Sequence, residues 1–192
     1  NEAGGFAVLV DGQPVYTCQA AEKGGADFDV IVGGRPGHSS VPHQSNPIVH
    51  LAPVLAGLGG KLPHRVIPAV GAFFERAAQA ARPEVAEHLR ALLDPTRCDE
   101  ALSLLPVAEP VRFMFDAMLR NTCTPTMLEA GVKRNVIPSS AAACLSGRPL
   151  PGVSAQEMRI EIEALLADPG AASARLELGN FRAGVSFDHA AP

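Results

Sequence analysis

The chain has 192 residues, 47% of them hydrophobic, which is enough to form the buried core of one domain. Its formal net charge is −4 and its basic residues are scattered, so it offers no basic face to a phosphate backbone. No uninterrupted apolar run approaches the roughly 20 residues that a membrane-spanning helix needs. We therefore expect neither a nucleic acid nor a membrane as a partner.

The first residue and the cysteines indicate whether the chain is a fragment and in which compartment it folds. The sequence starts at Asn1 without an initiator methionine or a leader, so we expect a missing upstream segment. No Cys-x-x-Cys pair occurs among Cys18, Cys98, Cys123 and Cys144. Buried free thiols are the simplest interpretation and favour a cytoplasmic protein. The same four cysteines would also permit disulfides in an oxidising compartment.

The first elements are β-rich. Residues 6–19 contain two apolar runs separated by Asp11-Gly12, a combination that predicts a two-stranded hairpin. The alternation of apolar and smaller or polar residues over 28–32 predicts a strand. A turn rich in glycine and proline follows at 33–42.

Helical patterns dominate the middle of the chain. Asn46 is a good N-cap with Pro47 at the first helical position, and apolar residues then recur at helical spacing up to Gly59-Gly60. Residues 68–119 remain helical in pattern. Four prolines divide this region into short pieces, so we expect a helical insertion of about 65–120. They are Pro83, Pro95, Pro106 and Pro110.

In the last third of the chain, predicted strands and a predicted helix alternate. Residues 122–128 and 141–145 look like neighbouring strands on either side of a turn at 133–140. Ser154 and Glu157 form a capping box for a helix that we expect to end at Asp168-Pro169-Gly170. A final strand is predicted over 174–181, and the tail beyond Gly184 looks irregular.

After the hairpin, the order is strand, helix, insertion, strand, strand, helix, strand. This is the ferredoxin-like β-α-β-β-α-β order of the α+β class. It predicts a four-stranded antiparallel sheet with two helices on one face. The open face or an edge strand remains available to a partner.

Single residues give little evidence of chemistry. The sequence contains neither His-x-Asp nor His-Glu-x-x-His. Glu157, Glu161 and Glu163 are most simply a solvated helix face. We assign no role to the histidines that lie in or beside helical stretches, namely His50, His64 and His88.

Several segments nevertheless form an ordered series of motifs that resembles a known family. They are Asn-Glu-x-Gly-Gly at 1–5, Thr-Cys-Gln-Ala-Ala-Glu-Lys-Gly at 17–24, Arg-Pro-Gly-His-Ser-Ser-Val-Pro at 35–42, Thr-Pro-Thr at 124–126, Asn-Val-Ile-Pro at 135–138 and Arg-Pro-Leu-Pro-Gly at 148–152. In this order and spacing they are similar to the dinuclear zinc peptidases. That family includes aminoacylase, carboxypeptidase S, glutamate carboxypeptidase and the acetylornithine and succinyl-diaminopimelate deacylases. The Gly-His-Ser-Ser-Val-Pro form looks closest to carboxypeptidase S.

The resemblance implies a domain organisation. Residues 24–182 would be the lid, or dimerisation, domain. Residues 1–23 would be a hairpin remnant of the catalytic domain, and 183–192 a tail leading back to it. The intact enzyme would hold two zinc ions. Glu2 matches one carboxylate ligand, and no other ligand has a match in the sequence. We therefore expect this fragment to bind no zinc by itself.

The resemblance also implies roles for three side chains. His38 matches a lid histidine that reaches into the partner subunit's active site and stabilises the oxyanion. Asn135 matches a substrate-binding asparagine, and Arg148 matches an arginine that holds the substrate carboxylate. Many relatives have an acidic residue where this chain has Ser146. Without the resemblance, His38 would simply order a turn, Asn135 would suit a left-handed turn, and Arg148 would be a surface cation.

The expected function follows from these matches. The chain would be part of a homodimeric zinc-dependent amidohydrolase that hydrolyses N-acyl amino acids or small peptides. Alone, it is expected to be inactive because the remaining metal ligands are missing. The alternative is a stand-alone ferredoxin-like module for dimerisation or for regulation by a small ligand.

Overall fold

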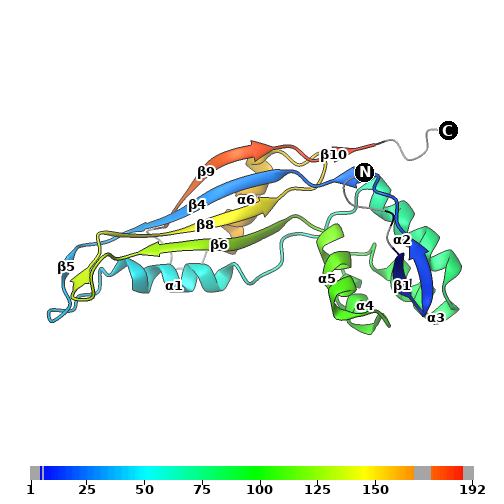
Figure 1. Ribbon diagram of the computed structural model, residues 1–192, viewed down its shortest axis with the longest axis horizontal. Coiled ribbons are helices and arrows are strands. Elements are labelled where there is room, and N and C mark those ends of the chain that lie inside the picture. The colour runs from blue at the N-terminus through cyan, green and yellow to red at the C-terminus, as the bar shows by residue number, and fades with distance from the viewer. Residues whose placement is uncertain (1–4, 6, 167–173, 188–192) are drawn as a thin grey trace.

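The structure, a computed structural model, describes residue 5, residues 7–166 and residues 174–187. The molecule is elongated, with a long sheet at one end and a group of short helices at the other (Figure 1). Within the described ranges, no helix has the length and apolar character needed to cross a membrane.

The sheet has four antiparallel strands in the order β6-β8-β4-β9. Their bounds are β4 (Gly25–Gly33), β6 (Thr122–Ala130), β8 (Ser140–Arg148) and β9 (Ala174–Arg182). Numbered along the chain as one to four, they lie in the order two, three, one, four. This is the ferredoxin-like arrangement, so the predicted fold class is confirmed.

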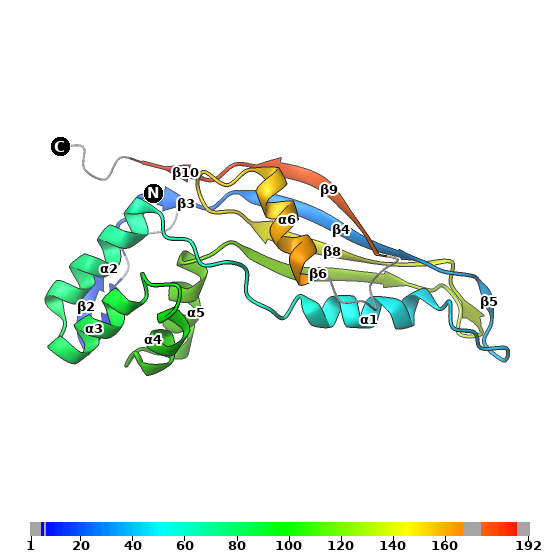
Figure 2. The ribbon, with the colours of Figure 1, turned by 180° about the vertical axis from the view of Figure 1, so that it is seen from behind.

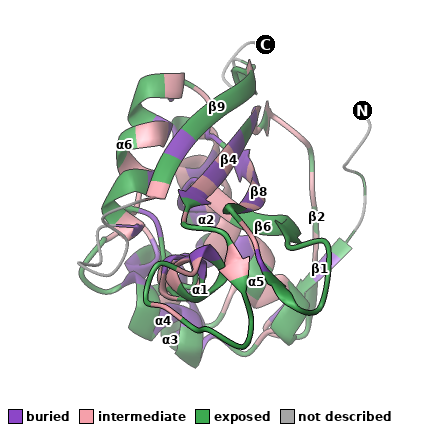
Figure 3. Ribbon diagram, turned by 90° about the vertical axis from the view of Figure 1, so that its left-hand side faces the viewer, coloured by how far each residue is buried: buried purple, intermediate pink, exposed green. Residues whose placement is uncertain are grey.

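Two helices cover one face of the sheet, α1 (Pro47–Gly57) and α6 (Ala155–Leu165). Figure 2 shows both on the same side. Alternate residues of the central strands face them. On β4, the side chains of Phe28 and Val30 are buried, whereas that of Asp27, on the opposite face of the sheet, is exposed. Figure 3 shows a second contrast, between the largely buried inner strands and the exposed edge strand β6.

Both covering helices begin as the sequence predicts. The Asn46 side chain accepts a hydrogen bond from the backbone N–H of Ile48 at 3.1 Å. Ser154 and Glu157 form the predicted capping box. The predicted end of α6 at 168–170 lies outside the described residues.

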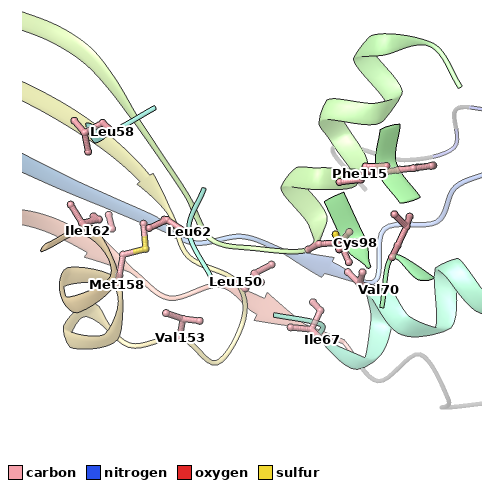
Figure 4. Packing of buried hydrophobic residues seen from close by; sticks show 14 of the residues in the cluster. Leu58, Leu62, Ile67, Val70, Cys98, Phe115, Leu150, Val153, Met158 and Ile162 are labelled. Atoms are coloured by element: carbon pink, nitrogen blue, oxygen red, sulfur yellow. The ribbon is translucent and has the colours of Figure 1, made fainter. Parts of the chain in front are cut away.

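The insertion lies at the other end of the molecule and consists of four short helices. They are α2 (Pro68–Ala80), α3 (Pro83–Ala91), α4 (Cys98–Leu104) and α5 (Glu109–Met118). Phe73, Phe74 and Phe115 pack edge to face, with ring centroids 5.1–5.8 Å apart. Apolar packing continues from α6 through Leu62 and Leu150 into this group (Figure 4).

The predicted hairpin is present as β1 (Ala7–Val10) and β2 (Gln13–Tyr16). Its turn has Asp11 at φ 53° and Gly12 at φ 73°, which is the left-handed pair that a tight two-residue hairpin requires. The guanidinium of Arg82 donates to the Asp11 carboxylate at 2.8 Å and so attaches the hairpin to the insertion.

Two expectations need correction. In the described part of the tail beyond Gly184, β10 (Val185–Ser186) pairs with β3 (Ala21–Glu22), two residues before β4 begins, so this part is not irregular. The four cysteines are free thiols, as predicted, but only Cys98 is buried. Cys18 is exposed, and Cys123 and Cys144 are partly exposed.

Candidate functional site

The first candidate site lies at the end of the sheet farthest from the insertion, which we call the tip. Here the two-residue strands β5 (Gly37–His38) and β7 (Val136–Ile137) pair antiparallel. The backbone N–H of Ser39 also donates to the carbonyl of Asn135 at 3.0 Å. These few bonds bring His38 and Asn135 together from segments 97 residues apart.

The imidazole of His38 has a defined orientation at this exposed position. Its Nδ1 lies 2.7 Å from the Ser40 hydroxyl oxygen and accepts from the Ser40 backbone N–H at 3.2 Å. A neutral ring that accepts at Nδ1 carries its proton on Nε2. Nε2 lies 3.3 Å from the side-chain Nδ2 of Asn135. Because both nitrogens are then donors, they can face a shared acceptor rather than bond to each other. The pair therefore presents an N–H donor and an amide to solvent, which suits hydrogen bonding to a substrate oxygen.

Sequence reasoning missed a third tip residue, His43. Both of its ring nitrogens are shielded from solvent without a hydrogen-bond partner in the described part of the chain. A Cβ on Gly37 would lie 3.0 Å from its Nε2, so the glycine allows the ring to pack beneath the strand that carries His38. The signal was a second histidine directly after the predicted turn at 33–42.

Arg148 lies at the opposite end of the sheet, which we call the base. It is the last residue of the nine-residue strand β8 and pairs with Thr122. At about 3.4 Å per residue, β8 alone separates the two ends by roughly 25 Å. One chain therefore unites His38 with Asn135 but does not bring Arg148 to them.

A second feature at the base was also missed, the largely buried ammonium of Lys23. Its Nζ donates to the carbonyl of Arg120 at 2.7 Å and lies 3.5 Å from the Thr122 hydroxyl. The pKa of Lys23 is lowered to about 8, chiefly by burial, while the charge of Asp116 raises it and the charges of Arg120 and Arg148 lower it. No pattern near Lys23 in the sequence indicates these contacts, which span 97 or more residues.

The predicted metal ligand Glu2 lies outside the described residues. Among the residues that are described, no three His, Cys, Asp or Glu side chains are placed to hold a metal ion.

The strand order and the two covering helices define the chain as an α+β domain of the ferredoxin-like type. The sequence matches the peptidase dimerisation domain family over residues 20–174, and the chain belongs to that family.

Known proteins similar to the chain are longer than it is. The N-fatty-acyl-amino acid synthase/hydrolase PM20D1 of Xenopus tropicalis is 29% identical over 171 residues, which cover 80% of this chain and 30% of that protein. The di-peptidase Dug1p of Saccharomyces cerevisiae has a similar fold, with a TM-score of 0.54 and 14% identity over 96% of this chain and 40% of its own. The metallo-carboxypeptidase Sso-CP2 of Sulfolobus solfataricus also has a similar fold, with a TM-score of 0.51 and 19% identity. The match covers 94% of this chain and 46% of that protein.

Proposed function

We propose that this chain is the lid and dimerisation domain of a homodimeric, zinc-dependent amidohydrolase that acts on N-acyl amino acids or small peptides. The observation that carries the proposal is the His38–Asn135 pair, which presents an imidazole N–H and an amide at an exposed tip. Membership of the peptidase dimerisation family supports the class of reaction. The name of the Xenopus relative supports N-acyl amino acids as substrates.

The metal belongs to another part of the enzyme in this proposal. The described residues contain no cluster of three metal-ligating side chains, and Glu2 contributes at most one carboxylate. We assign no reaction step to zinc within this chain. Its own residues bind and orient: Arg148 would pair with a substrate carboxylate, and Asn135 and His38 would donate to the amide oxygen as negative charge develops there.

The distance between the two ends of the sheet supports a site shared between two subunits. Because the length of β8, roughly 25 Å, separates the end of the sheet that carries Arg148 from the end that carries His38, we assign them to different active sites of a dimer. The edge strand β6 is suited to contact a second copy, since Met127 and Leu128 on it are 58% and 61% exposed. An uncovered apolar edge strand favours association with another chain.

Mixed dimers of the proposed full-length enzyme test the shared site. His38→Ala and Arg148→Ala homodimers should each lose about 100-fold or more in kcat/KM for an N-acyl amino acid. If His38 acts in the partner's site, a heterodimer of the two variants has one intact site and recovers up to half of the wild-type activity. No recovery in verified heterodimers would contradict action in the partner's site.

The isolated chain provides a second test. We propose that the 192 residues alone do not hydrolyse N-acyl amino acids when zinc is added. The stand-alone module is the competing proposal, and the encoded sequence on either side distinguishes the two. A His-x-Asp motif and a Glu-Glu pair upstream would favour the hydrolase, whereas a reading frame that starts near Asn1 would favour the module.

A further inference from the structure

A cavity of about 390 Å³ lies at the base, between the segment that follows the hairpin and the insertion. Residues 17–23 form one wall, and the first turns of α2 and the last turns of α5 form others. The side chains that line it are mostly apolar, among them Ile67, Val70, Phe73, Met114, Met118 and Leu150. Figure 4 shows Ile67, Val70 and Leu150 in this region. The volume and lining are typical of a small-molecule site.

The cavity has two charged wall residues, Lys23 and Glu22, and the Glu22 carboxylate is paired with Arg182 at 3.5 Å, which leaves Lys23 as the cation available to a ligand. Its ammonium donates to neutral oxygens of Arg120 and Thr122, and no carboxylate in the described ranges lies within salt-bridge distance. The charged groups that act on it from the surrounding elements are Asp116, Arg120 and Arg148. A largely buried cation without a directly bonded counter-charge is costly, and an anion that entered the cavity would relieve that cost.

We propose that this cavity binds a long-chain monocarboxylate, with the alkyl chain among the methionines and Phe73 and the carboxylate on Lys23. A neutral apolar ligand would leave the ammonium uncompensated, and a cationic amphiphile would be repelled by Lys23, Arg120 and Arg148. Methionine side chains adapt readily to a flexible chain.

The size of the cavity limits the ligand. A cavity of about 150 Å³ holds the six carbons of benzene. By that proportion, about 390 Å³ holds an alkyl chain on the order of ten to fifteen carbons. Decanoate is therefore a suitable probe, since its whole chain can be enclosed.

Calorimetry of the 192-residue chain with decanoate at pH 7 tests the site without any hydrolytic reaction. Decanoate should bind at least tenfold more tightly than decanol or decyltrimethylammonium. Octanoate should bind about tenfold more weakly than decanoate, because two fewer methylenes are buried. Equal affinity for decanoate and decanol, or no binding of either, would overturn the proposal.

Two variants separate charge from space. Lys23→Met should weaken decanoate binding at least tenfold and leave decanol binding unchanged. The matched substitution Lys133→Met, at an exposed residue that does not line the cavity, should change the affinity for neither decanoate nor decanol. Ala117→Phe keeps the ammonium but fills the cavity and should abolish binding. Circular dichroism checks that each variant is folded. Unchanged decanoate affinity in both Lys23→Met and Ala117→Phe would locate binding elsewhere and reject the site.

A competing occupant is a segment of the proposed catalytic domain. Decanoate binding to the isolated chain that disappeared in the proposed full-length enzyme would assign the cavity to that segment and overturn our inference. Binding in both forms would support it. These outcomes do not depend on the proposed hydrolase activity, so failure of one proposal does not entail failure of the other.

Discussion

The two ends of the sheet place polar side chains in opposite environments. At the tip, His38 and Asn135 are exposed, and the two-residue strands β5 and β7 hold their backbone. At the base, Arg120 is 7% exposed and Lys23 is largely buried. Exposed groups keep most of their hydration, whereas buried charges lose it. Substitutions of His38 and Asn135 should therefore affect chemistry, and substitutions of Arg120 and Lys23 should affect stability.

The base itself contains two kinds of buried cation. The Arg120 guanidinium donates to Asp116 at 2.8 Å, to Asp99 at 3.2 Å and to the Leu62 carbonyl at 3.0 Å. Lys23 has only neutral partners within hydrogen-bond distance. Removing one member of a buried ion pair leaves the other charge uncompensated, whereas removing a cation that has no counter-charge removes its desolvation cost. The same substitution, to methionine, should therefore have opposite effects at these two positions.

The largest expected effect is that of Arg120→Met. It removes the 2.8 Å partner of the partly buried Asp116 carboxylate, which keeps Lys61 at 3.5 Å, and it removes the link to Leu62. Because Asp116 stays partly compensated, we expect the free energy of unfolding to fall by about 3 kcal/mol in urea denaturation, the low end for a broken buried pair. The control Arg97→Met removes an exposed pair with Glu87 and should cost less than about 1 kcal/mol. Equal losses of unfolding free energy in the two variants would contradict our premise that the burial of Arg120 makes its ion pairs more important than the exposed pair.

Lys23→Met should have the opposite sign. Its pKa is lowered from 10.5 to about 8, so keeping the ammonium charged in the folded state at pH 7 costs about 3 kcal/mol. Allowing for the lost hydrogen bond, we expect the variant to be about 2 kcal/mol more stable than the wild type.

The pH dependence of stability checks the cause of that gain. Between pH 8 and 10.5 the unfolded chain holds the Lys23 proton and the folded chain releases it, so this residue makes stability rise with pH. Burial raises the pKa of Cys123 to about 11, so that thiol makes stability fall above pH 9 in both proteins. The measured quantity is therefore the difference between wild type and Lys23→Met, which should shrink as pH rises from 8 to 10. A constant difference would contradict the explanation.

A smaller effect is expected from the helix caps, one near each end of the sheet. Asn46→Ala and Ser154→Ala each remove a side-chain acceptor for a helix N-terminus and should each cost about 1 kcal/mol in urea denaturation. Because Asn46 follows the turn that carries His38, only Asn46→Ala should shift the NMR signals of the His38 ring. If both variants shifted the His38 ring signals equally, the ring would respond to a general loss of stability rather than to the nearby helix cap.

Local patterns in the sequence predict much of this fold. Asp11-Gly12 fixes the hairpin because few residues tolerate positive φ, and Asn46 and Ser154 fix two helix starts. The two-residue strands β5 and β7 were not predicted, because so short a pairing has no periodicity to detect. Pairing of β3 with β10 was missed for the same reason.

The candidate site was predictable only in part. The motifs around His38 and Asn135 identify both residues, and the structure brings their side chains to 3.3 Å. The surroundings of Lys23 depend on contacts with Arg120 and Thr122 nearly a hundred residues away. Neighbouring glycines and a glutamate give that lysine the pattern of an exposed turn. Its burial follows from how the insertion packs against the sheet, which local spacing does not encode.

The smallest expected effect on stability is at the tip. His38→Ala removes exposed hydrogen bonds to Ser40 and an exposed contact with Asn135, so water can replace them. We expect the free energy of unfolding to change by less than about 0.5 kcal/mol. The matched variant Asn135→Ala should behave alike, since it removes the other member of the same pair. A loss above about 1.5 kcal/mol in either variant would mean that the pair holds β5 against β7, in which case reduced hydrolysis in the mixed-dimer experiment would report folding rather than chemistry.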